Sequence, residues 1–189
     1  MNLNPQQLEG VHHTEGPLLI LAGAGSGKTR VITQRIVCLV QQQKVSPRNI
    51  LAVTFTNKAA EEMRHRVQGL LGSTAQDIWI STFHSSCVRI LRNSRGIMTS
   101  VPSNFVIYDD DDSLTLVKEC LEELKIDDRS FSPRMILSNI SSAKNELITP
   151  AQYTQKASEF LENRIASIYS LYQKKLEQNQ ALDFGDLIF

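Results

Sequence analysis

Cysteine is scarce in this sequence of 189 residues, and the three that occur, Cys38, Cys87 and Cys120, form no Cys-x-x-Cys pair. An odd and sparse set of thiols argues against a disulfide framework and fits a reducing compartment. Apolar runs are short, such as 17–22, whereas a membrane helix needs about 20 apolar residues in a row. Residues 1–5 also lack the basic and then apolar pattern of a secretory signal. We therefore expect no membrane segment and no secretion.

Net charge is absent as well, because 20 Lys and Arg residues balance 20 Asp and Glu residues. Proteins that bind nucleic acids usually carry a basic surplus, so this balance by itself argues against such a partner. The charges are segregated, however. Residues 1–100 hold 11 basic and 5 acidic residues, and residues 101–189 hold 9 and 15. The basic first half is either a chance difference between two subdomains or the half that meets a polyanion.

Composition places the chain among ordinary globular proteins, with 41% hydrophobic and 21% charged residues. This content excludes wholesale disorder. The length suits one domain, or one domain and part of a second, with a core that needs neither metals nor disulfides.

The first half alternates short apolar runs with segments of helical period. Continuous apolar runs are typical of strands buried on both faces, and they occupy 18–22, 50–54 and 78–82. A helical segment follows each run, and Asn4-Pro5 predicts a further helix to about residue 13. Because strand and helix alternate three times, the sequence predicts a parallel sheet with helices, and so an α/β fold.

The second half reads as mostly helical, apart from one strand at 105–108. A helix is predicted over 111–124, and two more begin after Ser132-Pro133 and Thr149-Pro150, where a hydroxyl precedes proline at the first helical position. A last long helix carries an apolar stripe made of Ile165, Ile168, Tyr169, Tyr172 and Leu176. An α/β unit therefore ends near 90–95, and a helical unit follows it.

The segment 22–29 has the pattern of a phosphate-binding loop, except that Ala22 stands where the first glycine is usual. Glycines allow backbone angles that a β-carbon forbids, so the N–H groups of such a turn can point inward beside a helix N-terminus. Lys28 would reach the β- and γ-phosphates, and the Thr29 hydroxyl would bind Mg²⁺. A glycine-rich turn that binds nothing is the alternative. The predicted phosphate-binding residues are Ala22, Gly23, Ala24, Gly25, Ser26, Gly27, Lys28 and Thr29, of which Lys28 and Thr29 are the catalytic candidates and Thr29 the metal ligand.

Two further segments, 54–58 and 81–85, stand at the carboxyl ends of the next two predicted strands. Ligands bind at that edge of open α/β sheets. Each segment places one aromatic ring among hydroxyl and amide groups, a mixture that suits a sugar-phosphate backbone with unstacked bases. From the residues alone, Phe55 and Phe83 are more often core side chains than ligand contacts.

Taken together, four ordered motifs closely resemble the UvrD/PcrA/Rep group of superfamily 1 DNA helicases. They occupy 4–7, 22–30, 53–64 and 81–84. Residues 183–187 also look like the motif that precedes the second ATPase segment of that family. The resemblance therefore covers the whole chain, although the helical half is matched mainly by its layout.

The resemblance implies an ATP-driven motor that moves 3′→5′ on single-stranded DNA, with ATP and Mg²⁺ as cofactors and single strands and duplex junctions as partners. In that family a glutamine at the position of Gln7 reads the adenine, and Arg30 belongs to the nucleotide site. The implied fold is a P-loop (RecA-like) parallel sheet, subdomain 1A, over 1–90, a helical subdomain 1B over 91–182, and a return to 1A at 183–189. The implied DNA-binding residues are Thr54, Phe55, Thr56, Asn57, Thr82, Phe83 and His84.

Departures from the family pattern limit the expected activity. The Asp-Glu pair that positions the attacking water would follow Phe189, and the second motor domain with its arginine fingers is not in the sequence. Phosphoryl transfer depends on such positioning and charge stabilisation, so we expect this chain alone to bind nucleotide and to turn it over very slowly. It reads as the N-terminal part of an intracellular helicase, cytoplasmic or nucleoid-associated, or nuclear or organellar in a eukaryote, that needs the remainder of its chain. The alternative is a non-catalytic nucleotide- or DNA-binding regulatory module.

Other polar clusters have simpler interpretations. The run 109–112 of four aspartates could suggest a metal site, but it stands where a helix begins and is interpreted as capping. Arg89, Arg92 and Arg95 share a spacing of three and could contact phosphates or face solvent. His12, His13 and His65 are interpreted as surface residues, and Cys38, Tyr169 and Tyr172 as packing residues.

Overall fold

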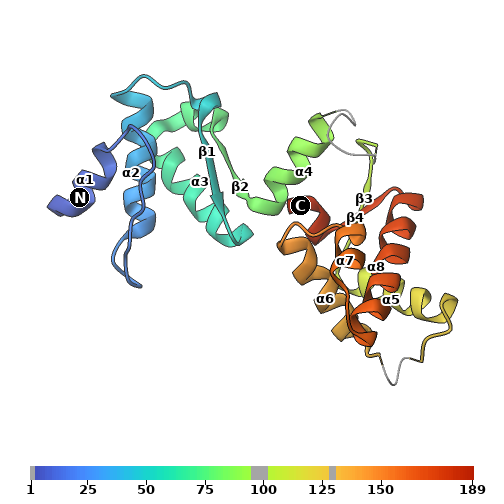
Figure 1. The fold of residues 1–189 in the computed structure, drawn as a ribbon. Coiled ribbons are helices and arrows are strands. Elements are labelled where there is room, and N and C mark those ends of the chain that lie inside the picture. The colour runs from blue at the N-terminus through green and yellow to red at the C-terminus, as the bar shows by residue number, and fades with distance from the viewer. Residues whose placement is uncertain (1–2, 95–101, 128–130) are drawn as a thin grey trace. The chain divides into compact units, whose positions relative to one another are not determined.

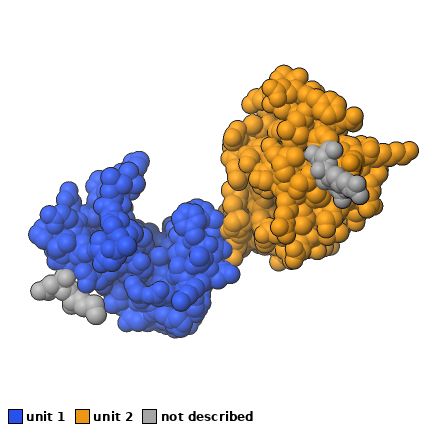
Figure 2. All heavy atoms as spheres, turned by 90° about the horizontal axis from the view of Figure 1, so that it is seen from below, with its two compact units in different colours: residues 1–83 blue, residues 84–189 orange. Residues whose placement is uncertain are grey.

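The computed structural model describes residues 3–94, 102–127 and 131–189 (Figure 1). The chain divides into two compact units, residues 1–83 and 84–189, which we call unit 1 and unit 2 (Figure 2). Within the described residues, no helix is both long and apolar enough to cross a membrane.

Unit 1 contains helices α1 (Pro5–His12), α2 (Lys28–Gln41) and α3 (Asn57–Leu71), and two short 3-10 turns, η1 (Pro47–Asn49) and η2 (Gly72–Asp77). Its strands β1 (Leu51–Thr54) and β2 (Trp79–Thr82) pair in parallel, with Thr54 opposite Thr82. This register brings the carboxyl ends of both strands to the same edge, as the sequence predicts. The core between these elements consists of Ile36, Ile50, Ala52, Met63, Val67, Ala75, Ile78 and Ile80.

Local signals explain where the helices of unit 1 begin and end. Asn4 accepts a hydrogen bond from the Gln7 backbone N–H, and the Gln7 side chain accepts one from the Asn4 N–H, which is a reciprocal capping box. The Thr56 hydroxyl accepts from the Ala59 N–H at the start of α3. The same helix ends at Gly72, whose φ of 62° is readily adopted only by glycine.

The prediction of a strand at 18–22 is wrong. These residues form no strand, and Leu19 and Leu21 are 81% and 87% exposed. A buried strand requires neighbours that satisfy its N–H and C=O groups. In the described part of unit 1 the strands are β1 and β2, which pair with each other, so the predicted sheet has two strands there instead of three.

Unit 2 begins with the main part of α4 (Phe83–Asn93) and continues through β3 (Val106–Tyr108), α5 (Asp110–Glu123), α6 (Pro133–Asn145), α7 (Pro150–Lys156) and α8 (Phe160–Gln178). These elements confirm the predicted strand and helices of the second half. The structure adds β4 (Ala181–Asp183), parallel to β3, and α9 (Phe184–Ile188), neither of which was predicted. The main core includes Leu116, Val117, Cys120, Leu121, Ile136, Ile140, Ile168, Tyr169, Tyr172 and Leu176.

The aspartate run at 109–112 caps α5, as predicted. Asp109 accepts hydrogen bonds from the backbone N–H groups of Asp111 and Asp112, both at 2.9 Å, and Asp112 accepts one from the Asp109 N–H. Among the described residues, no group of three His, Cys, Asp or Glu side chains could hold a metal ion. Cys38, Tyr169 and Tyr172 are buried, which confirms their interpretation as packing residues, while Arg95 lies outside the described residues.

Candidate functional site

The glycine-rich loop at 22–29 turns directly into helix α2. Gly25 and Gly27 have φ values of 76° and 88°, in the left-handed region where a side chain would be strained. The Ser26 backbone N–H and hydroxyl both donate to the Gly23 carbonyl, at 3.3 and 2.7 Å, and close the turn. The resulting hollow of about 350 Å³ is lined by Gly25, Ser26, Gly27, Lys28, Thr29, Arg30 and Arg66.

Positive charge dominates this hollow. Among the residues that the structure describes, its lining contains Lys28, Arg30 and Arg66 and no carboxylate. The Lys28 ammonium donates to the carbonyls of Ala22 and Gly23, at 2.9 and 2.7 Å, so it lies over the loop. A helix N-terminus adds partial positive charge at the same place, because the first N–H groups of α2 have no partner within the helix. The chemistry of the lining therefore fits a polyanionic ligand such as a polyphosphate.

Gln7 joins α1 to the loop. Its side-chain amide donates to the Ser26 carbonyl at 2.9 Å, and its oxygen accepts from the Arg30 guanidinium at 3.2 Å. The Arg30 Nε is buried and has no hydrogen-bond partner within the structure described. An orphaned donor at this position fits a ligand that brings acceptors of its own.

Arg66 was not among the predicted site residues. It lies on α3, forms an ion pair with Glu62 one helical turn away, and lines the same hollow as the phosphate-loop residues. Its position in the sequence, on the helix that follows the strand after the loop, offers no pattern from which this placement could be read. Only the packing of α3 beside α2 brings the guanidinium there.

The carboxyl ends of β1 and β2 carry the second predicted set of residues. Phe55 is 90% exposed, so its interpretation as a core side chain is wrong. Its ring lies 5.4 Å from the ring of Phe83, which is 41% exposed, so two aromatic rings are available at this edge. Asn57 is exposed at the start of α3, whereas Thr82 is buried and the Thr54 and Thr56 hydroxyls make local bonds that shape the turn.

His84 is exposed in the first turn of α4 and belongs to unit 2. Its ring meets the ring of Phe184 edge to face, with centroids 5.6 Å apart and planes at 75°. Phe184 is the first residue of α9, so the short helix that was not predicted from the sequence supplies the neighbour of a predicted site residue.

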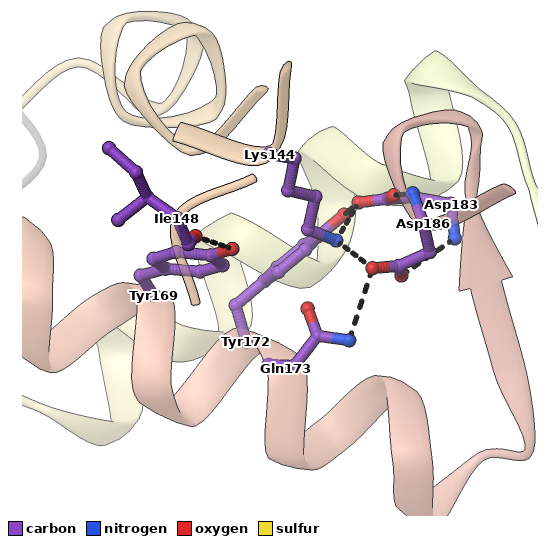
Figure 3. Close-up of polar contacts among 7 residues, drawn as sticks. All are labelled: Lys144, Ile148, Tyr169, Tyr172, Gln173, Asp183 and Asp186. Atoms are coloured by element: carbon purple, nitrogen blue, oxygen red, sulfur yellow. Dashed lines mark hydrogen bonds and ion pairs between the residues drawn. The ribbon is translucent and has the colours of Figure 1, made fainter. Parts of the chain in front are cut away.

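A buried group of charged side chains joins α9 to α6 and β4. The Lys144 side chain is 1% exposed, and its ammonium lies 2.7 Å from oxygens of both Asp183 and Asp186, whose side chains are 9% and 10% exposed (Figure 3). Burial alone would raise the pKa of Asp183. The charge of Lys144 and hydrogen bonds from Lys144, the Asp186 backbone and Tyr172 outweigh it, so this pKa lies below its usual value. Burial and the Asp183 charge hold the pKa of Asp186 above its usual value, although Lys144 opposes them.

Comparison with known proteins places the chain in a family. Residues 3–189 match the UvrD/REP helicase N-terminal domain. The sequence is 53% identical over 186 residues to the ATP-dependent DNA helicase PcrA of Bacillus subtilis (strain 168). It is 52% identical over 187 residues to PcrA of Staphylococcus epidermidis and 51% identical to PcrA of Staphylococcus aureus (strain Mu50). These alignments cover 98–99% of this chain but 25–26% of the relatives, so the chain spans about a quarter of their length. The chain therefore belongs to the UvrD/REP helicase family and corresponds to its N-terminal domain.

Proposed function

We propose that unit 1 binds Mg²⁺-ATP through the loop at 22–29. The observation that carries this proposal is a hollow bounded by two left-handed glycines, a helix N-terminus and three cationic side chains, with no carboxylate in its lining. Such a cradle favours phosphate groups, since backbone N–H groups and the helix dipole both attract negative charge.

Each residue has a distinct part in this proposal. Lys28, which donates to two loop carbonyls, would meet phosphate oxygens, and the Thr29 hydroxyl would hold Mg²⁺, which would neutralise phosphate charge. Gln7 would read the adenine, and its bonds to Ser26 and Arg30 fix its amide beside the loop. Arg30 and Arg66 add positive charge to the same hollow.

Single-stranded DNA is the second proposed ligand, at the carboxyl edge of β1 and β2 and at the start of α4. The exposed pair Phe55 and Phe83 offers faces for unstacked bases, and Asn57 and His84 offer polar contacts to the backbone. Thr54, Thr56 and Thr82 shape this edge, because two of them make local hydrogen bonds and the third is buried.

The complete protein is proposed to be an ATP-dependent 3′→5′ DNA helicase that acts inside the cell, with unit 1 as part of motor subdomain 1A and most of unit 2 as subdomain 1B. The 189-residue chain by itself binds nucleotide with little turnover, because none of the described residues that line the hollow is a carboxylate that could orient an attacking water. Robust DNA-stimulated ATPase activity of the highly purified chain would contradict this assignment of the essential groups.

Calorimetric titration with Mg²⁺-ATP tests the nucleotide site. Lys28→Ala is expected to abolish measurable binding, since it removes the ammonium that meets the phosphates. Lys174→Ala is the matched control, because Lys174 is an exposed lysine on α8 of unit 2 and is expected to leave the affinity unchanged. An unchanged affinity in Lys28→Ala would overturn the assignment of the phosphate loop.

A further inference from the structure

The charges buried in unit 2 have no part in the proposed binding of nucleotide or of single-stranded DNA. Lys144 belongs to α6, Asp183 ends β4 and Asp186 lies in α9, so the group joins three elements (Figure 3). Buried ion pairs are weak stabilisers, because the cost of taking the charges out of water offsets most of their attraction.

All four oxygens of the two carboxylates accept hydrogen bonds that hold α9 against its neighbours. Asp183 accepts from the Asp186 backbone N–H at 2.8 Å and from the Tyr172 hydroxyl at 2.8 Å, besides Lys144 at 2.7 Å. Asp186 accepts from the Asp183 N–H and from the Gln173 amide, both at 3.2 Å. A helix of five residues has little stability of its own, so these bonds and the buried Leu187 determine where α9 lies.

Phe184 lies between Asp183 and Asp186 in the sequence and connects this buried group to an exposed side chain of unit 2. Its backbone is fixed on both sides by the capping box of Asp183 and Asp186, while its ring remains 42% exposed and meets His84 edge to face. Gly185 leaves room for the lysine, because a β-carbon there would lie 2.8 Å from Lys144 Cδ. A continuous series of contacts therefore runs from a buried ammonium to an exposed imidazole within unit 2.

We propose that Lys144 is a positioning residue for His84. The ammonium locks the two carboxylates, the carboxylates fix α9, and the Phe184 ring at the start of α9 sets the orientation of the imidazole. The value of this device for binding rests on the proposed contact of His84 with single-stranded DNA, whereas the mechanical link itself stands on the contacts within unit 2.

Proton NMR of the histidine rings tests the mechanical link. The neighbouring Phe184 ring is expected to shift the His84 signal, which is assigned by its loss in His84→Asn. Phe184→Leu is expected to remove this shift, and Lys144→Met is expected to change it in the same direction. Lys175→Met is the matched control, because Lys175 pairs with Glu119 and Glu123 in the same unit and has no contact with α9 among the interactions described. The His84 signal of Lys175→Met is expected to stay at the wild-type position.

A folded Lys144→Met protein whose His84 signal is unchanged would overturn the positioning role, since a merely structural lysine lowers stability without moving that signal. Should Lys144→Met not fold, Asp186→Asn replaces it, because it weakens the same network while keeping a polar side chain. An unchanged His84 signal in folded Asp186→Asn would overturn the proposal equally.

Binding of a fluorescent oligo-dT strand tests the consequence for DNA. Phe184→Leu is expected to weaken binding by about five-fold in the wild-type background and to have no effect in His84→Ala, which is the signature of coupled residues. Equal losses in both backgrounds would overturn the inference that Phe184 acts through His84. Unchanged affinity in His84→Ala alone would instead overturn the proposed DNA contact, and the NMR result would still decide the positioning.

Discussion

Units 1 and 2 bury their apolar residues to very different extents. Among the described residues, ten of the eleven largest fully buried side chains belong to unit 2, and Val67 represents unit 1. Both units also expose large apolar side chains, and those of unit 1 that stand next to its motifs include Leu19 and Leu21 before the glycine-rich loop and Phe55 after β1. The proposed ligand sites of unit 1 therefore lie in the part with the smaller core, and the larger core supports charged and aromatic groups that it holds in place.

Removal of the buried Lys144 charge should give the largest difference in stability loss between the two units. Lys144→Met is expected to lower the free energy of unfolding by about 3–5 kcal/mol, because it leaves two buried carboxylates without their partner. Arg66→Met in unit 1 breaks an exposed ion pair and should cost about 0–1 kcal/mol. Chemical denaturation followed by circular dichroism measures both, and equal losses would contradict the contrast between buried and exposed pairs.

Truncation of core side chains is the second comparison. Ile140→Ala in unit 2 is expected to cost about 2–5 kcal/mol of unfolding free energy, because the side chain is fully buried and its removal leaves a cavity. Leu19→Ala in unit 1 should change stability by no more than about 0.5 kcal/mol, since that side chain is largely exposed. A large loss in Leu19→Ala would show that 18–22 is packed in solution.

For ligand binding, in contrast to stability, the larger effect is expected in unit 1. Phe55→Ala is expected to weaken binding of single-stranded DNA by about 1–3 kcal/mol, through loss of a stacking ring, without lowering stability. Phe160→Ala is the matched control, because it removes another exposed ring, 69% accessible, from unit 2. Fluorescence anisotropy at fixed salt measures both affinities, and similar losses would argue against a specific stacking site at Phe55.

The smallest expected effect is a difference in pH dependence between the two buried carboxylates. The lowered pKa of Asp183 means that its stabilising contribution is present above the ordinary aspartate pKa and is lost as pH falls through the lowered value. Asp186 has a raised pKa, so its contribution is present at low pH and is lost as pH rises through the raised value.

Asp186→Asn measures this difference. Relative to wild type it should gain stability as pH rises from acid, because it removes the carboxyl group with the raised pKa and leaves Asp183 paired with Lys144. Unfolding free energies of both proteins, measured from acid to neutral pH, give the two slopes. A loss of stability relative to wild type over this range would contradict the raised pKa of Asp186.

Much of the local structure could be predicted because its causes are local. The capping residues Asn4, Thr149 and Asp109, the stop at Gly72 and the apolar stripe of α8 all act within a turn or two of the chain, and the helices that they predict are present. The parallel pairing of β1 and β2 also follows from the alternation of strand and helix. The strand expected at 18–22 shows the limit, since an apolar run has the composition of a strand whether or not a neighbour pairs with it.

The sequence by itself determined the family motifs, the conformation of the glycine-rich loop and the positions of most helices, because spacing, capping and glycine content act along the chain. Only the tertiary structure decided that Arg66 lines the hollow beside the loop, that Phe55 is exposed rather than buried, and that Lys144 meets Asp183 and Asp186. Those contacts join residues up to 42 positions apart, as between Lys144 and Asp186, and no local pattern encodes them. They exist because packing of separate elements excludes water, and a buried charge must then find its partner wherever the fold places one.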